Sequence, residues 1–399
     1  MSKDSLEKLN FSKYNSEEVN QVIRQHLKLI TEEILNFKDR LGLVSIILTG
    51  GFGRGEGSVL IKDRVVKPVN DYDISIIVKK HAPFLKNVPD PRVFGIISQI
   101  SSKIKNKIQS AGVDIDILLY DQLPYSENSI KNFEKRFGSQ VIWGLDAIGL
   151  LPEYDPKEIP LSDGVKLLFN RMTCLINGFP QANINRPNFS IQQSVKALHA
   201  CCEALLLISG NYSYSYEERG RRFKLIFPNE FPDLSKNFPK LLEYIEKSIK
   251  FKLFPDYEIF AGYRELWPTV VDMYFEVLKY YIGKTYALGD SDLESIVNCV
   301  LNNLRGKLSE NIIYWGGYLL NMWAHKIRVL KCDLSCKPKI YLYASESFLL
   351  YLMRYGYNQE YIELARSYLN RIIDVTDKDD LLELRIKTIK AFGSGAYEA

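Results

Sequence analysis

Two pairs of aspartates in this chain have a spacing that can place carboxylates side by side. Asp71 and Asp73 are separated by one residue in the segment DYDISIIV, and Asp114 and Asp116 repeat this spacing in VDIDILL. Alternate residues of a β-strand point to the same face, so each pair would project together from a strand. Adjacent carboxylates repel unless a cation lies between them, and such oxygen ligands suit Mg²⁺. The alternative for a single pair is a solvent-facing strand with incidental acids.

The second pair lies in the more apolar setting, which predicts a mostly buried strand at 113–119. A carboxylate buried in such a strand costs several kcal/mol unless it is paired or bound to a metal. If this strand neighbours the first, a third acid would join Asp71 and Asp73 in a two-metal site. Sites of that kind stabilise the attacking and leaving oxygens of an in-line displacement at phosphorus.

A glycine-rich segment precedes the first pair. Residues 49–57 read TGGFGRGEG, with five glycines after the apolar run 44–48. Glycines here expose backbone N–H groups and let a phosphate approach closely, although a plain turn would use them as well. The segment is not a P-loop, because no Gly-Lys-Ser/Thr follows, and it fits the dinucleotide-binding fingerprint poorly.

Taken together, these motifs resemble the DNA polymerase β-like nucleotidyltransferase superfamily. The similarity rests on Gly50-Gly51-Phe52-Gly53-Arg54-Gly55, Asp71-Tyr72-Asp73 and Asp116, and covers roughly residues 40–125. The glycine run is most similar to that of the minimal nucleotidyltransferases, whose loop reads Gly-Ser-x-Ala-Arg-Gly. This chain departs from the pattern in having glycine at position 51, and its spacer of 19 residues before Asp71 is long. A hairpin at 59–67 would absorb the excess length.

The resemblance implies roles for the acids. Asp71 and Asp73 would hold two Mg²⁺ ions, or Mn²⁺ in their place, and Asp116 would complete the site and help deprotonate the acceptor hydroxyl. Asp114 lies one pleat earlier on the same face and stays open as the third carboxylate. Asp116 is favoured because the stretch that follows it, IDILLYDQLP, is similar to that of the minimal enzymes.

The resemblance also implies a nucleotide-binding set of Gly50, Gly51, Arg54 and Lys196. Arg54 would pair with a triphosphate oxygen, with a salt bridge to Glu56 or elsewhere as the equal alternative. Family members often use a lysine and an aromatic residue of the helical domain, which makes Lys196 and the tyrosine-rich, basic segment 210–224 candidates. The alternative for that segment is a solvated basic turn.

The implied reaction is metal-dependent transfer of a nucleoside monophosphate from an NTP, expected to be ATP, with release of pyrophosphate. The acceptor would be a hydroxyl of a small molecule or a protein. The alternatives are an RNA 3′-end nucleotidyltransferase and a catalytically silent nucleotide-binding or scaffold protein. The net charge is only +4 over 399 residues. A long nucleic acid is therefore not the expected partner, because such proteins generally carry a basic stripe.

The surrounding elements divide the chain. Helical periodicity runs over 19–34 and 92–109, strands are expected at 44–48, 71–78 and 113–119, and long helices dominate beyond about 160. We therefore predict an α/β (α+β) fold, with a small nucleotidyltransferase-type mixed sheet and its helices followed by a mostly α-helical region. The expected domains are a nucleotidyltransferase domain at 1–155, a helical domain at 156–288 and a helical C-terminal region at 289–399, which can be continuous with the second.

Location and further sites follow from composition. The six cysteines do not suggest a disulfide framework, and the pair Cys332 and Cys336 lacks the second pair of a zinc site. No apolar run reaches the roughly 18 residues of a bilayer span; the nearest, Ile312–Trp323, is interrupted by two glycines. The N-terminus lacks the apolar core of a signal peptide. We therefore expect a cytoplasmic protein with no membrane partner.

Overall fold

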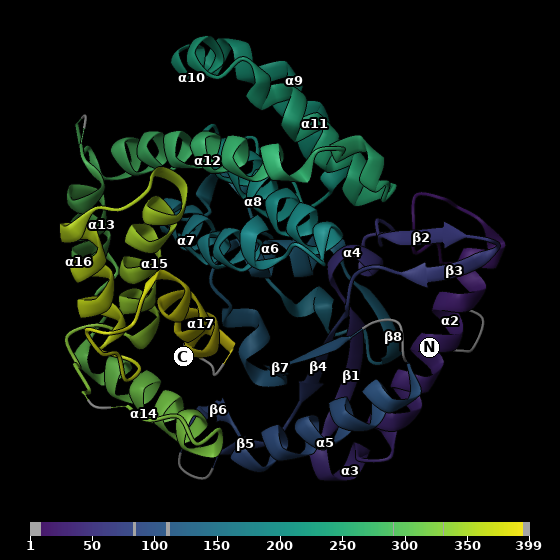
Figure 1. Ribbon diagram of the computed structural model, residues 1–399. Coiled ribbons are helices and arrows are strands. Elements are labelled where there is room, and N and C mark those ends of the chain that lie inside the picture. The colour runs from purple at the N-terminus through teal and green to yellow at the C-terminus, as the bar shows by residue number, and fades with distance from the viewer. Residues whose placement is uncertain (1–8, 83–84, 109–111, 290, 330, 394–399) are drawn as a thin grey trace. The chain divides into compact units, whose positions relative to one another are not determined.

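The computed structural model describes residues 9–82, 85–108, 112–289, 291–329 and 331–393, and these form a mixed α and β structure (Figure 1). The chain divides into two compact units. The first comprises Met1–Pro160, Ser209–Ile226 and Glu246–Ile259, and the second comprises the remaining three segments. The mixed α+β class expected from the sequence is confirmed at this level.

A four-stranded sheet in the order β7-β4-β1-β8 forms the centre of the first unit. β1 (Leu43–Leu48) pairs antiparallel with β4 (Tyr72–Val78) and with β8 (Gln140–Gly144), and β4 pairs parallel with β7 (Val113–Leu119). The three predicted strands are confirmed. β8 was not anticipated, because its apolar run Val141–Trp143 is only three residues long.

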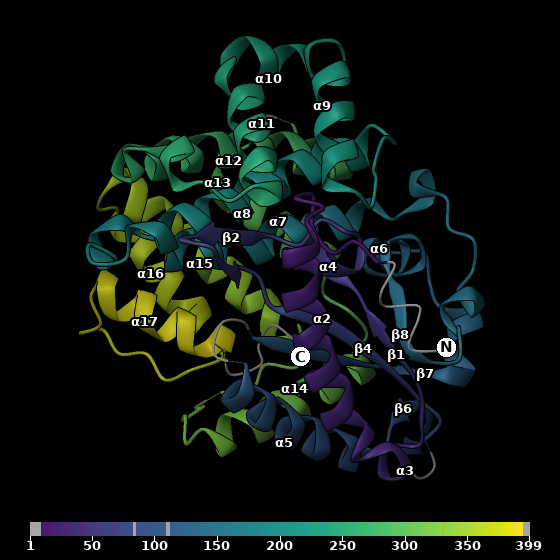
Figure 2. The same ribbon diagram turned by 90° about the vertical axis from the view of Figure 1, so that its right-hand side faces the viewer.

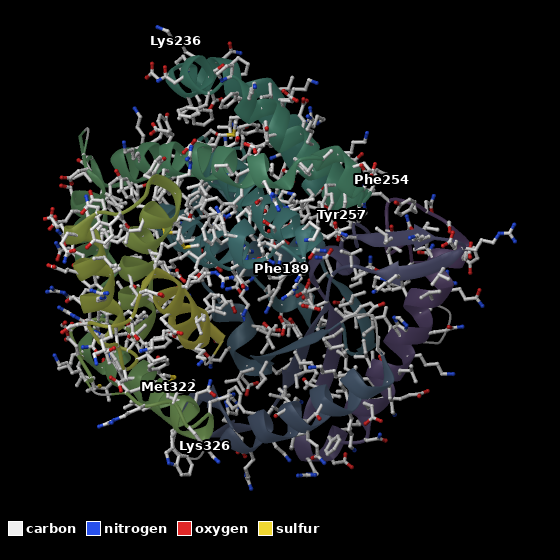
Figure 3. The ribbon with its side chains drawn as sticks, viewed as in Figure 1. Phe189, Lys236, Phe254, Tyr257, Met322 and Lys326 are labelled. Carbon is white, nitrogen blue, oxygen red and sulfur yellow. The ribbon has the colours of Figure 1, made fainter. Side chains whose placement is uncertain are left out.

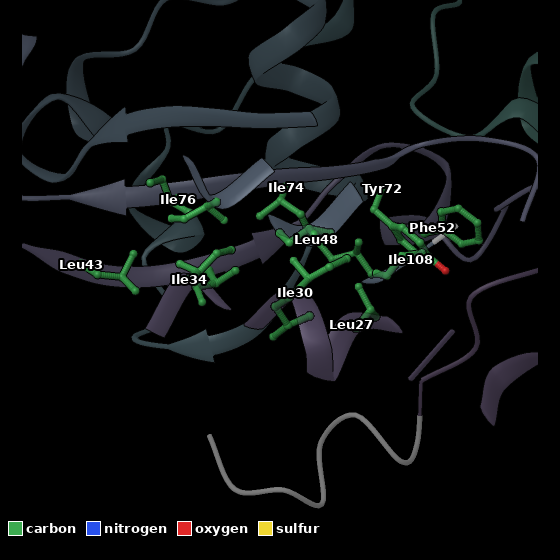
Figure 4. Packing of buried hydrophobic residues seen from close by; sticks show 14 of the residues in the cluster. Leu27, Ile30, Ile34, Leu43, Leu48, Phe52, Tyr72, Ile74, Ile76 and Ile108 are labelled. Carbon is green, nitrogen blue, oxygen red and sulfur yellow. The ribbon is translucent and has the colours of Figure 1, made fainter. Parts of the chain in front are cut away.

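Two helices cover one face of this sheet: α2 (Glu17–Leu35) and α5 (Pro91–Lys107). In Figure 2, α2 runs across the strands. Figure 4 shows Ile30 and Ile34 of α2 packed near Ile74 and its neighbours on β4. Because strand side chains alternate, burying the even-numbered residues of β4 on this side directs the odd-numbered residues, the aspartate among them, to the other face.

The long spacer before the first aspartate pair does contain the predicted hairpin. β2 (Val59–Lys62) pairs antiparallel with β3 (Val65–Pro68). Asp63 and Arg64 form its turn, with φ values of 51° and 63°. The other small elements of the first unit are α3 (Lys38–Leu41), α4 (Gly50–Gly53), β5 (His81–Ala82), β6 (Leu85–Pro89), α6 (Ile130–Gly138) and short 3₁₀ turns at Tyr120–Tyr125, Ile148–Leu150 and Pro156–Glu158.

The third predicted strand is less buried than its apolar sequence suggested. Within β7 only Leu119 is fully buried, and Asp114 is exposed. The reason is that β7 lies at the edge of the four-stranded sheet and has a strand neighbour on one side only.

The second unit is helical. Its helices are α7 (Leu161–Asn177), α8 (Pro187–Ile208), α10 (Pro232–Asn237), α12 (Tyr263–Tyr286), α13 (Leu293–Asn303), α14 (Leu308–Ala324), α15 (Pro338–Tyr355), α16 (Gln359–Leu369) and α17 (Leu381–Ala391), with a 3₁₀ turn at Pro180–Ala182. α15 is the most buried of them and packs against α7 and α16. None of the described helices has both the length and the apolar character needed to cross a bilayer.

Two further helices are divided between the units: α9 (Tyr216–Glu230) and α11 (Lys240–Leu253). The first part of α9 and the last part of α11 belong to the first unit, although the sequence placed both in a domain at 156–288. The expected boundary near 155 lies close to the end of the first segment at Pro160, and the residues on either side of 288 fall in one unit. Contacts described below explain why these helices join the sheet.

Candidate active site

The glycine-rich segment turns directly over Asp73. Thr49 donates its backbone N–H to the carbonyl of Asp73 at 2.8 Å, which holds the end of β1 to β4. Gly50 follows with φ +61°, and a Cβ atom at this position would overlap the carboxylate of Asp73. Glycine is required here for both reasons, since other residues rarely adopt this backbone conformation. The turn and the carboxylate are therefore in contact.

Aromatic packing supports the glycine turn. Phe52, in α4, stacks on Tyr72 with ring centroids 4.7 Å apart, and both side chains are fully buried (Figure 4). The Tyr72 hydroxyl lies 2.8 Å from Nδ1 of His26 on α2. Burial lowers the pKa of His26, which favours the neutral imidazole, and its Nδ1 can then accept a hydrogen bond from the Tyr72 hydroxyl. Sequence reasoning had treated Phe52 only as part of the glycine motif.

Asp73 lies in an environment that disfavours its charge. Burial, opposed by the Lys252 ammonium and reinforced by Asp114, raises the pKa of Asp73 to about 6. A nearby cation would stabilise the ionised form of this carboxyl group.

Asp71 and Asp114 accompany Asp73 on the same side of the sheet. Asp71 is exposed and accepts the backbone N–H of Gly112 at 2.9 Å. Asp114 is the direct cross-strand partner of Asp73 in the parallel pair. Asp114 is exposed along one side, but the protein that surrounds its carboxyl group on the other side, followed by the charges of Asp71 and Asp116, raises its pKa. These three carboxylates influence one another, as the sequence spacing predicted for Asp71 and Asp73.

Asp116 is held in a different way. It lies opposite Ser75, one pleat along from Asp114, and forms ion pairs with Lys135 and, at 3.1 Å, with Lys131. Burial opposes its ionisation, but the two lysines of α6 outweigh that effect and lower the pKa of Asp116. Asp114 is thus the cross-strand partner of Asp73, and Asp116 is paired with Lys135. The choice between Asp114 and Asp116 as the third carboxylate stays a prediction, and this pairing favours Asp114.

A lysine that sequence reasoning missed lies at the glycine turn. Lys252, in α11, donates to the Asn70 side chain at 3.0 Å, and its Nζ would be 3.4 Å from a Cβ placed on Gly51. The same ammonium lowers the pKa of Asp73. No local pattern marks Lys252, because 182 positions separate it from Asn70.

Arg54 has a structural partner in place of the expected phosphate. Its side chain is only 5% exposed and pairs with Glu134 at 3.0 Å and with Glu56 at 3.8 Å. The guanidinium also lies over the ring of Tyr216, 5.0 Å from the centroid. The structure contains the salt bridge that the sequence offered as the alternative, and a contact of Arg54 with a triphosphate stays a prediction.

These buried charges tie the glycine turn to α9. Glu134 of α6 accepts from Arg54, from the Tyr212 hydroxyl at 2.6 Å and from Arg219. Burial opposes its ionisation, but Arg219 and Arg54 prevail and lower the pKa of Glu134 to about 2. Tyr212 and Arg219 of the segment 210–224 therefore belong to a buried network in the first unit, whereas Arg221 and Lys224 of the same segment are exposed.

Glu56 makes the second link, at the beginning of α9. Its carboxylate accepts from the Ser215 hydroxyl at 2.7 Å and from the backbone N–H groups of Tyr216 and Glu217 at 2.8 and 3.2 Å. A carboxylate at this place satisfies N–H groups that the first helical turn leaves without partners. The result is that Tyr216 lies beside the turn, with Lys252 5.3 Å from its ring centroid.

Lys196, the lysine proposed from the sequence, lies on α8 in the second unit, and its side chain is exposed. Its role in nucleotide binding stays a prediction. Within the first unit, Lys252 and Tyr216 are a lysine and an aromatic residue that lie beside the glycine turn.

The chemistry of the site fits a hard divalent cation. Asp71, Asp73 and Asp114 offer carboxylate oxygens, and a bound cation would reduce the repulsion among their negative charges. Among the described residues, however, no three acidic, histidine or cysteine side chains lie close enough to hold a metal ion. A cation here would need ligands from water and substrate phosphates, which is the usual manner of Mg²⁺ binding. The chain matches no protein-family model, no curated protein and no solved structure.

Proposed function

We propose that the first unit is a metal-dependent nucleotidyltransferase, which transfers a nucleoside monophosphate from an NTP to an acceptor hydroxyl. One observation carries the proposal: a glycine turn, a carboxylate whose pKa is raised by burial, and a lysine meet at the end of β1. Gly50 lies against Asp73, and Gly51 lies beside Lys252. Backbone N–H groups with a lysine can hold phosphates, while neighbouring carboxylates can hold the cation that accompanies them.

In this proposal the groups of the site divide phosphate binding, cation binding and proton transfer among them. The backbone at Gly50 and Gly51 and the ammonium of Lys252 bind the phosphates. Asp71, Asp73 and Asp114 hold Mg²⁺, which would neutralise charge on the phosphates. A bond forms between the acceptor oxygen and the α-phosphorus, the bond from that phosphorus to the bridging oxygen breaks, and pyrophosphate leaves. The exposed Asp114 takes the proton of the acceptor hydroxyl.

The acceptor is a hydroxyl of a small molecule or a protein. The net charge of +4 supports this choice, because affinity for a long nucleic acid depends on many phosphate contacts. The basic residues of segment 210–224 support it further, since Arg219 is buried and Arg222 pairs with Glu218. They are partnered within the protein and do not form a stripe for a polyanion.

Pyrophosphate release measured with each of the four NTPs and Mg²⁺ tests the activity. Labelled NTPs with a host lysate, separated into small-molecule, protein and RNA fractions, identify the acceptor class. The matched variants are the double substitution Asp71→Asn with Asp73→Asn, and Asp63→Asn at the hairpin turn as the control. Asparagine tolerates the positive φ of that turn, so the control should fold normally.

We expect release from the wild type and from Asp63→Asn, none from the double variant, and none after addition of EDTA. Label in the RNA fraction, with tight and strongly salt-dependent tRNA binding, would promote the RNA 3′-end alternative. Equal release from the double variant and the wild type would end the proposal. No release with any NTP, and no thermal stabilisation by them, would favour the silent scaffold.

A further inference from the structure

Helix α14 (Leu308–Ala324) presents an unusual surface in the second unit. Only one row of its side chains is buried: Asn311, Trp315, Tyr318 and Met322. Trp315 donates to the carbonyl of Cys336 at 2.9 Å and Tyr318 to that of Ile372 at 2.8 Å, so this row is anchored. The position of α14 on its own unit is therefore specified by its inner face.

The outward side of α14 is apolar where a surface helix is normally polar. Ile313, Leu320 and Trp323 are 71%, 70% and 80% exposed. With the helical repeat of 3.6 residues, the apolar arc covers about half of the circumference. Its members are Leu308, Ile312, Ile313, Gly316, Gly317, Leu319, Leu320 and Trp323. A contiguous, exposed apolar surface along a whole helix is typical of an interaction surface.

Basic residues stand at both ends of this helix. Arg305 and Lys307 precede it, and Lys326, Arg328 and Lys331 follow it; all five are exposed. Over residues 305–331 the only acid is Glu310, so this short stretch has a net charge of +4, equal to that of the whole chain. Glu310 pairs with Lys337 at 3.2 Å and does not offset the flanking charge. Figure 3 shows Lys326 at the periphery of the protein, beyond Met322.

We propose that α14 docks on the surface of an anionic lipid membrane. The apolar arc would enter the boundary of the acyl chains, while Trp323 and the flanking cations would lie at the level of the headgroups. Attraction of the five cations to anionic lipids adds to burial of the apolar arc. The helix does not span the membrane. The sequence expectation of no membrane partner considered only spanning segments and signal peptides.

The charges argue against a second copy of the chain as the occupant. If two α14 helices packed antiparallel, Arg305 and Lys307 of one copy would meet Lys326 and Arg328 of the other. In a parallel pair, each basic end would meet its own equivalent. Like charges oppose one another in both arrangements, whereas an anionic lipid surface is complementary at both ends.

Co-sedimentation of the full chain with lipid vesicles tests the proposal. One set of vesicles contains equal amounts of phosphatidylserine and phosphatidylcholine, and the other contains phosphatidylcholine alone. We expect binding to the first set and at least about tenfold weaker binding to the second, and salt should weaken the binding. The double variant Leu320→Gln with Trp323→Gln should lose binding, and Lys326→Gln with Lys331→Gln should weaken it about fivefold per cation.

Matched controls use side chains that are also exposed and lie on other helices. Leu225→Gln with Leu382→Gln removes apolar surface elsewhere, and Lys236→Gln with Lys240→Gln removes charge elsewhere. Neither control should change vesicle binding. Binding lost equally in the controls would overturn the assignment to α14. Absence of vesicle binding by the wild type would also overturn it, whether or not a concentration-dependent dimer, abolished by the Leu320→Gln and Trp323→Gln variant, is found instead.

Discussion

The two D-x-D motifs have the same spacing, yet the pKa values of their second aspartates, Asp73 and Asp116, shift in opposite directions. Asp73 lies beneath the glycine turn, and its pKa is raised to about 6. Asp116 lies between two lysines of α6, and its pKa is lowered. The difference comes from what packs on the sheet at each position. An acid already neutralised by the protein has little need of a metal, whereas an acid without that compensation is available for one.

The largest expected effect separates Asp114 from Asp116 as catalytic groups. We expect Asp114→Asn to lower the rate of pyrophosphate release roughly 10²- to 10³-fold, because a group that faces the reacting atoms is removed. Asp116→Asn should have a much smaller effect on rate. Kinetics at a temperature where near-UV circular dichroism shows both variants folded provide the measurement. A larger loss of rate in Asp116→Asn than in Asp114→Asn would identify Asp116 as the third carboxylate and contradict the contrast drawn between the two motifs.

The second prediction concerns stability. Lys135 is only 6% exposed, and Lys135→Met leaves Asp116 without its main partner, so we expect a loss of about 3 kcal/mol in the free energy of unfolding. Lys131→Met removes a lysine that is 69% exposed and should cost less than about 1 kcal/mol. Urea unfolding of both variants measures the difference. Equal losses of unfolding free energy in the two variants would show that the buried ion pair of Lys135 with Asp116 is no more important for stability than the exposed pair of Lys131.

A third prediction uses pH. An ordinary aspartate has a pKa of 3.8, while the folded-state pKa of Asp73 is about 6. Between these values the folded protein holds a proton that the unfolded chain has released, so stability falls as the pH rises from about 4 to about 6. We expect about 2 kcal/mol from Asp73, after allowance for its partial contact with solvent. Asp116, with its lowered pKa, contributes stability above pH 3.8 that is lost only in stronger acid.

Urea unfolding across this pH range, with wild type, Asp73→Asn and Asp63→Asn, provides the measurement. Asp73→Asn should remove the decline and should be at least as stable as the wild type at neutral pH. Parallel curves for Asp73→Asn and the wild type would mean that burial of Asp73 does not control this titration.

The smallest effect concerns the lysine at the glycine turn. We expect Lys252→Met to raise the Kd for MgATP about tenfold, which corresponds to about 1.4 kcal/mol. Lys250→Met, an exposed lysine of the same helix, is the control. Lys196→Met should also leave the Kd unchanged. Isothermal titration gives all three values. A larger effect from Lys196 than from Lys252 would reinstate the sequence expectation.

The sequence alone determined the elements that depend on local patterns. Alternation in DYDISIIV and VDIDILL identified two strands, the turn between 59–61 and 64–67 identified a hairpin, and helical periodicity identified α2, α5 and most of the second unit. These features follow from side-chain spacing along a few consecutive turns or pleats. The need for glycine before the first aspartate pair was also visible, although its reason, contact between Gly50 and Asp73, was not.

Only the tertiary structure decided which charges meet. The two D-x-D motifs are indistinguishable by spacing. Asp116 differs from Asp73 because Lys135 and Lys131 pair with Asp116, whereas burial outweighs the effect of Lys252 at Asp73. Arg54 was assigned to Glu134, 80 positions away, and Lys252 to Asn70, 182 positions away. Pairings over such distances depend on how helices pack on the sheet, because burial forces each charge to find a partner among the residues that packing brings near it.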